Sequence, residues 1–194
     1  MSLEAFAKIA DASRLLLERG FTEETVSECL GLVGRAIGVD RVYIFENVTT
    51  AEGELACAQR YEWAEGVKPE IDNPTLQEVP YAQILPEWST TLAEGKPVYG
   101  LVEDLPKELQ DILRPQDIIS ILICPITLNG RWWGFVGFDD CHTPRDWPAE
   151  EVAVLRTLAR ALGGSLRHTQ MQSTLRAARE QLQEVLSSTT ERKG

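Results

Sequence analysis

IISILICPITLNGRWWGFVGFDDCHTPRDWPAEE, residues 118–151, predicts two strands, a loop and a helix start in direct succession. Residues 118–128 are apolar and β-branched, and residues 131–139 are rich in aromatic side chains. Asn129-Gly130 between them can adopt the left-handed conformations of a type I′ turn. Pro148 followed by two glutamates is typical of a first helical turn. The stretch therefore predicts a β-hairpin that leads through an irregular loop into a long helix.

Two helices are predicted before the first strand. Apolar residues recur at helical spacing over residues 3–17, and Gly20 is well placed to end that helix. Thr22 is a suitable N-cap for a second helix that runs to Gly38, because its hydroxyl can accept from the free N–H groups of the first turn. The apolar stripes of both helices are expected to cover a sheet.

A second hairpin is predicted from residues 41–48 and 55–63, which are rich in β-formers and joined by a turn-prone segment. The middle of the chain is broken by prolines, so loops are expected to dominate there, with a short helix over 85–93 and a brief strand at 97–99. Two hairpins with flanking helices indicate an α+β fold.

The string GFDDCHTPRDWPAEE, residues 137–151, resembles the loop through which many signalling GAF domains leave their last strand, of the form G-F-D-x-C-x-x-P-R-x-W. The resemblance implies a central antiparallel sheet of five or six strands with helices packed on it, plus a long C-terminal signalling helix. The organisation expected is an N-terminal amphipathic helix over 1–19, a GAF-like sensor domain over 20–165 and a coiled-coil-like linker helix over 166–194.

Composition limits the partners. The sequence has 19 Lys and Arg residues and 30 Asp and Glu residues. The resulting net charge of -11 disfavours nucleic acid and anionic lipid as partners. The sequence contains no membrane span or signal peptide pattern, and its four cysteines form no C-x-x-C pair. A cytoplasmic protein with reduced thiols and no membrane contact is expected.

The end of the chain carries a possible dimer seam. Apolar residues there are spaced 4, 3, 4 and 3, as in a coiled coil, although the pattern lasts only about two heptads. One interpretation is a parallel homodimer through the terminal helices, and the alternative is a helix folded back on its own domain. The seam residues are Met171, Leu175, Ala178, Leu182 and Val185.

The irregular middle contains an unusual density of aromatic side chains with polar groups, which can wall a small-molecule cavity. The GAF resemblance places a ligand between the sheet and this segment, and Arg60 on the second strand is a candidate contact for an anionic ligand. The alternative is that the aromatics only fill space beneath loops. The cyclic-nucleotide motif of the family has no match, and the ligand stays unidentified. The candidate ligand-binding residues are Arg60, Tyr61, Trp63, Tyr81, Trp88 and Tyr99.

Asp139, Asp140, Cys141 and His142 include ligand types for zinc or iron, but adjacent residues cannot easily converge on one ion. The preferred interpretation is a structural loop in which an aspartate caps backbone donors and Cys141 packs inward, with no metal site. Related photoreceptors attach bilins to a cysteine sometimes followed by histidine, but that cysteine precedes the final hairpin, whereas Cys141 follows it.

No catalytic residues are predicted, and no cofactor is assigned. Cys57 and Cys124 lie in predicted strands, where cysteine is usually a small buried hydrophobe, so a thiol enzyme similar to GAF-like free-methionine sulfoxide reductases is a distant alternative. The resemblance implies a regulatory module linked to an effector domain of histidine kinase or diguanylate cyclase type. A ligand-free GAF domain that serves only as a dimerisation scaffold is the main alternative.

Overall fold

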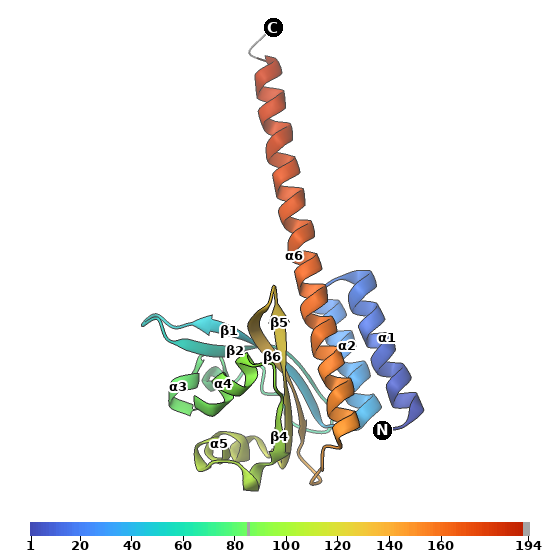
Figure 1. Ribbon diagram of the computed structural model, residues 1–194, viewed down its shortest axis with the longest axis vertical. Helices are drawn as coiled ribbons and strands as arrows, with labels where there is room; N and C mark the ends of the chain where they lie inside the picture. Colours follow the sequence, from blue (N-terminus) through green and yellow to red (C-terminus); the bar gives the residue numbers. More distant parts are fainter. Residues whose placement is uncertain (85, 192–194) are drawn as a thin grey trace.

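Within the described residues, 1–84 and 86–191, the computed structural model folds around a six-stranded antiparallel sheet with the strand order β3-β2-β1-β6-β5-β4 (Figure 1). The two predicted hairpins, β1-β2 and β5-β6, meet where β1 pairs with β6 at the centre of this sheet. The α+β fold and the antiparallel sheet expected from the sequence are therefore confirmed.

The strands are β1 (Arg41–Thr49), β2 (Leu55–Ala64), β3 (Val79–Pro80), β4 (Val98–Leu101), β5 (Ser120–Leu128) and β6 (Arg131–Asp140). The helices are α1 (Leu3–Arg19), α2 (Glu23–Ile37), α3 (Tyr81–Ile84), α4 (Pro86–Ala93), α5 (Lys107–Leu113) and α6 (Ala149–Glu191). Single 3₁₀ turns lie at Pro74–Leu76, Val102–Asp104 and Arg114–Gln116.

Local signals in the sequence explain the ends of several elements. The Thr22 hydroxyl accepts a hydrogen bond from the Thr25 amide at 3.2 Å and caps α2, as predicted. Gly38 ends α2 in the left-handed conformation. Asn129 and Gly130 both have positive φ, 53° and 77°, so the two-residue turn between β5 and β6 has the predicted handedness.

One face of the sheet is covered by α1, α2 and α6 (Figure 1). The helices contribute one apolar stripe each, and Leu155, Leu158 and Leu162 of α6 are fully buried against the sheet. Gly34 allows α2 to approach β2 closely, because a Cβ there would overlap the ring of Trp63. The Ser165 hydroxyl donates to the Leu16 carbonyl at 2.6 Å and joins α6 to α1. This face forms the larger hydrophobic core.

The other face is covered by α3, α4 and α5, which belong to the proline-rich middle of the chain (Figure 1). Trp88 and Leu92 of α4 and Leu109 and Leu113 of α5 are buried there against aromatic residues of the central strands. The middle segment therefore forms a second, smaller core. The sequence did not predict β3, a two-residue strand that pairs with β2.

The helix α6 extends far past the rest of the molecule (Figure 1). The Thr169 hydroxyl accepts a hydrogen bond from the Phe21 amide at 2.8 Å, and beyond it residues 170–184 are exposed. No helix among the described residues is long and apolar enough to cross a membrane.

Candidate functional site

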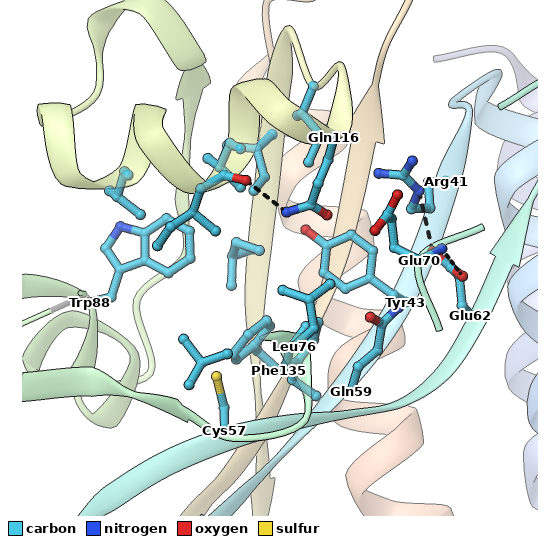
Figure 2. A pocket seen from close by; sticks show the side chains of 18 residues that line it. Arg41, Tyr43, Cys57, Gln59, Glu62, Glu70, Leu76, Trp88, Gln116 and Phe135 are labelled. Carbon is cyan, nitrogen blue, oxygen red and sulfur yellow. Dashed lines mark hydrogen bonds and ion pairs between the residues drawn. The ribbon is translucent and has the colours of Figure 1, made fainter. Parts of the chain in front are cut away.

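A cavity lies between the sheet and the helices α4 and α5 (Figure 2). The cavity has an accessible volume of about 60 Å³. At roughly 10–15 Å³ for each water, this space holds several waters or a molecule of a few heavy atoms. The cavity is lined by Arg41, Tyr43, Phe45, Cys57, Gln59, Glu62, Glu70, Leu76, Val79, Trp88, Leu109, Ile112, Leu113, Gln116, Ile118, Ile121, Ile123 and Phe135.

Most of the cavity wall is apolar. Phe45 and Phe135 stack with their ring centroids 5.0 Å apart and form part of its floor on β1 and β6. Trp88 of α4 is buried and closes the apolar end, while Leu109 comes from α5 (Figure 2). Such walls exclude water and favour apolar parts of a ligand.

The opposite end of the cavity is polar and buried (Figure 2). Arg41 Nε lies 3.2 Å from Glu62 Oε1, and Arg41 Nη1 lies 3.4 Å from Asp139 Oδ2, with all three side chains at most 3% exposed. The Tyr43 hydroxyl donates to Asp139 Oδ1 at 2.9 Å. The other Glu62 oxygen accepts from the amides of Glu70 and Ile71, both at 2.8 Å. The network fixes these groups in place.

Burial sets the protonation of this network. Burial raises the pKa of Asp139 to about 7, although Arg41 and the Tyr43 hydroxyl oppose the rise. Burial also raises the pKa of Glu62, against the effect of its backbone donors and Arg41. The pKa of Tyr43 is raised mainly by burial and further by the Asp139 carboxylate, so Tyr43 remains a donor.

A second set of ion pairs connects the end of β6 to the start of α6. Arg145 Nε lies 2.7 Å from Asp140 Oδ2, and Arg145 Nη1 lies 3.0 Å from Glu151 Oε1 in the first turn of α6. The same guanidinium donates to the Ile37 carbonyl at the end of α2, at 2.7 Å. It also lies 5.0 Å from the ring centroid of Trp147. The loop motif of the sequence is thus a structural joint between β6, α2 and α6.

Tyr61 and Trp63 do not line the cavity, which corrects the grouping expected from the sequence. A bulge in β2, where Ile44 pairs with Tyr61 and Phe45 with Gln59, shifts the alternation of side chains by one residue. As a result Gln59 and Glu62 face the cavity, while Tyr61 and Trp63 pack against the helix face.

The other predicted site residues lie in different places. Trp88 lines the cavity. Tyr81 is buried in the same core, donates to Asn47 Oδ1 at 2.8 Å and packs on Trp132. Tyr99 is 47% exposed and lines a neighbouring surface groove with Trp88. Arg60 pairs with Glu46 at 2.8 Å and is absent from the cavity wall.

The expectation that Asp139 or Asp140 caps backbone donors is wrong, because both hold arginine side chains. Asp40 has that role instead, since its Oδ2 accepts from the Cys141 amide at 2.7 Å. The same oxygen lies 3.0 Å from Nδ1 of the largely exposed His142. Among the described residues, no three His, Cys, Asp or Glu side chains are grouped as metal ligands.

The cysteines predicted in strands are buried. Cys57 lines the cavity and Cys124 lies in the core on the helix face. Burial raises the pKa of each thiol to about 12, so both are protonated at neutral pH and poor nucleophiles.

The coiled-coil pattern lies on the free part of α6. Met171, Leu175 and Leu182 are 65%, 72% and 61% exposed, and Ala178 is exposed as well. The side chain of Val185 lies outside the described residues. The alternative in which this segment packs on its own domain is therefore wrong.

The polar end of the cavity was not predicted from the sequence. Arg41, Tyr43 and Phe45 alternate with apolar Val42 and Ile44 along β1, and this period of two marks one face of the strand. That alternation was the available signal. Glu70 lies in a loop, where no periodic pattern could have placed it.

The comparison with known proteins agrees with this architecture. A model of the GAF domain family matches residues 22–166. The chain is 43% identical over 176 residues to the methanogenesis regulatory histidine kinase FilI of Methanothrix harundinacea (strain 6Ac), which covers 90% of this chain and 20% of that protein. It is 25% identical over 145 residues to an uncharacterised protein of Azorhizobium caulinodans, which covers 72% of the chain and 20% of that protein. The chain thus spans about a fifth of the length of the curated relatives it matches.

Solved structures show the same fold at low identity. The blue-light absorbing form of the Thermosynechococcus elongatus PixJ GAF domain has a TM-score of 0.66 and 14% identity, with 89% of this chain and 94% of that chain covered. The phycocyanobilin-bound GAF domain of a cyanobacterial phytochrome has a TM-score of 0.69 and 15% identity, with coverages of 89% and 98%. With the family match across most of the chain and the sheet, helices and loop joint described above, the chain belongs to the GAF domain family.

Proposed function

We propose that this GAF domain senses a small molecule in the cavity and passes the signal through α6 to a linked effector of the histidine kinase class. The observation that carries the proposal is a series of short contacts between the cavity and α6. Glu62 at the cavity meets Arg41, and Arg41 meets Asp139. The next residue in the chain, Asp140, holds Arg145, which holds Glu151 in the first turn of α6.

A ligand at the polar end would act on the first members of this series. If it drew Glu62 away from Arg41, the charge balance around Asp139 would change, and with it the position of the end of β6. The relay requires that α6 has two arrangements. A ligand shifts the equilibrium between them only to the extent that it binds one more tightly than the other. The proposed relay is therefore electrostatic, and it starts at the ion pair between Glu62 and Arg41.

The proposed effector class is based on the relative of known class. The match to a regulatory histidine kinase of much greater length supports a kinase rather than a diguanylate cyclase beyond this domain. The four free cysteines suit a reducing compartment, so the domain is proposed to work in the cytoplasm.

The terminal helices are proposed to form the dimer interface. Leu3, Phe6 and Leu17 of α1 are exposed, in addition to the seam on α6. Apolar side chains at heptad spacing on a projecting helix gain stability when a second copy covers them. A parallel homodimer would place the two α6 helices side by side.

Bilin binding is not part of the proposal. The cavity is far below the roughly 300–1,000 Å³ of pockets for drug-sized ligands, and its 60 Å³ cannot hold an extended tetrapyrrole. The small size also favours the second candidate function, a dimerisation scaffold without ligand.

Native mass spectrometry of the protein purified from its source organism, followed by metabolite analysis after denaturation, separates the two candidates. A sensor should carry a stoichiometric small molecule. Hydrogen exchange with and without the compound so identified should then change both around Trp88 and along residues 166–184. Protein without any bound molecule would support the scaffold, and a response confined to the cavity would contradict the relay.

A further inference from the structure

The polar end of the cavity has an excess of negative charge. Arg41 is the only buried cation among its described lining residues, and it pairs with Glu62 and with Asp139 behind the wall, while Glu70 adds a further carboxylate to the lining. Glu70 is 8% exposed, and its Oε1 lies 3.6 Å from the ammonium of Lys68, a side chain that is 83% exposed. Its Oε2 accepts a hydrogen bond from Asn73 Nδ2 at 2.7 Å, which leaves the charge without a buried cation. Even with Asp139 protonated, the cavity wall carries two carboxylates, Glu62 and Glu70, and one guanidinium. Buried charges are normally paired, so this end favours a further cation.

Two buried acceptors at this end also lack a hydrogen-bond donor. Gln59 is 3% exposed, and its Oε1 has no partner. Glu62 Oε1 is close enough to Arg41 for an ion pair, but the geometry is not that of a hydrogen bond. Both residues line the cavity, and Figure 2 shows Gln59, Glu62 and Glu70 on the same side of it. Buried acceptors without donors are costly, and a ligand with N–H groups would satisfy them.

Arg41 is a poor receptor for an anion. Its Nη2 already donates to the Lys68 carbonyl at 3.0 Å, and its Nη1 lies 3.4 Å from Asp139 Oδ2. Its Nε makes no hydrogen bond, but it lies 3.2 Å from Glu62 Oε1, whose charge it offsets. An anionic ligand would also place a further negative charge beside Glu62 and Glu70. Repulsion in a buried site would oppose its binding.

We infer that the cavity takes a compact organic ammonium ion, with Glu62, Glu70 and Gln59 as its acceptors and a short apolar body against Phe135, Leu76 and Trp88. The inference rests on the proposed ligand-binding function. The accessible 60 Å³ limits the ligand to a few heavy atoms. Apolar walls at one end and carboxylates at the other then select for charge as well as size.

Three compounds of similar size and different charge test this inference: n-butylamine, which is protonated at pH 7, 1-butanol and butyrate. Each is titrated into the full 194-residue chain, with binding followed by amide chemical shifts in NMR spectra. The ammonium ion should bind at least about tenfold more tightly than the alcohol, because a hydrogen bond to a charged group contributes about 1.5–3 kcal/mol. Butyrate should bind more weakly than both.

Two variants identify the acceptors. Glu70→Gln and Glu62→Gln should each weaken n-butylammonium binding about tenfold and leave 1-butanol binding unchanged. Glu62 also accepts two backbone hydrogen bonds, so its substitution can prevent folding. In that case Glu70→Gln is the deciding variant. The matched control is Glu52→Gln, an exposed glutamate outside the cavity, which should not change either affinity.

Equal affinity for the ammonium ion and the alcohol, tighter binding of butyrate, or wild-type affinity in Glu70→Gln would overturn the inference. Absence of binding by all three compounds would overturn it as well. The proposed sensor function would survive each of these results if the native protein carries a small molecule of another charge. It would fail separately, through mass spectrometry, if no small molecule is bound.

Discussion

Arg41 and Asp139 face each other across the central strand pair of the sheet, 98 residues apart in sequence and at most 3% exposed. The pair lies between the cavity and the loop that begins α6. Gly137 makes room for this arrangement, because a Cβ there would overlap the ring of Tyr43, whose hydroxyl donates to the same aspartate. A buried ion pair of this kind depends on pH as well as on sequence.

Stability should fall as the pH rises from about 4 to about 7. The pKa of Asp139 is raised from 3.8 in its ordinary state to about 7 in the folded protein, so the folded state holds a proton that the unfolded chain has lost. Below about pH 4 both states are protonated, and the stabilisation is fully present. It is lost as the pH rises through the folded pKa of about 7. Asp139→Asn should make the dependence of the urea midpoint between pH 5 and pH 8 less steep, with the remainder due to Asp140, whose pKa burial raises to about 6. An equally steep dependence in the variant would show that Asp139 does not titrate in this range.

The Arg145→Gln substitution should lower the free energy of unfolding by about 1–3 kcal/mol, because Asp140 and Glu151 would lose their shared cation in a largely buried site. Arg35→Gln is the control, since Arg35 also lies over a tryptophan ring, that of Trp63 at 5.5 Å, but its ion pair with Glu65 at 3.9 Å is exposed. It should change stability by no more than about 1 kcal/mol. Chemical denaturation measures both variants. Equal effects would contradict a joint centred on Arg145.

Gly34→Ala should destabilise the domain by about 1–3 kcal/mol, because the added methyl group would overlap the Trp63 ring where α2 packs on the sheet. Gly164→Ala in α6 is the matched control, since a Cβ there meets no neighbouring atom. That substitution should be neutral or slightly stabilising through helix propensity. Thermal unfolding of both variants checks the prediction, and an equally stable Gly34→Ala protein would refute the close approach.

A Leu182→Glu substitution should weaken the proposed homodimer more than about tenfold, because a charge replaces an apolar side chain in the seam. Ser173→Glu introduces the same residue on α6 at a position outside the a and d seam and should have little effect. Analytical ultracentrifugation gives the dissociation constants. A monomeric wild-type chain at high micromolar concentration, or equal constants for both variants, would exclude this seam as the interface.

The variants Cys141→Ala and His142→Ala should leave the metal content and the visible absorbance of the purified protein unchanged. Asp40 holds both residues through hydrogen-bond contacts, as expected of a structural loop. Loss of a metal ligand normally reduces metal occupancy. Elemental analysis and an absorbance spectrum measure both properties. Stoichiometric zinc or iron that disappears with either substitution would establish a metal site here.

The hairpins, the helix caps and the loop over residues 141–148 were predictable because each depends on local chemistry. Asn129-Gly130 needs only its own backbone to specify a turn, and Thr22 caps the helix that follows it. The faces of β2 were not predictable, since the bulge near Arg60 depends on pairing with β1. Strict alternation would have placed Tyr61 on the cavity side.

The candidate site was located only in part for the same reason. Trp88 was predicted, but the polar groups come from β1, β2 and a loop, and only the fold brings them together. Glu70 carries no periodic signal in the sequence. Its position depends on the Glu62 carboxylate, which accepts from the backbone of that loop. Long-range pairing of this type is invisible to a local pattern.

The hydrogen bond between Phe21 and Thr169 is a pivot point for a tilt of the projecting part of α6. Past it, α6 continues to Glu191 for about 33 Å at a rise of 1.5 Å per residue. For a stiff rod of that length, each degree of tilt at the base moves the far end by about 0.6 Å. A rearrangement at the Arg145 joint too small to disturb the core would therefore be magnified at the far end into a shift of several ångströms.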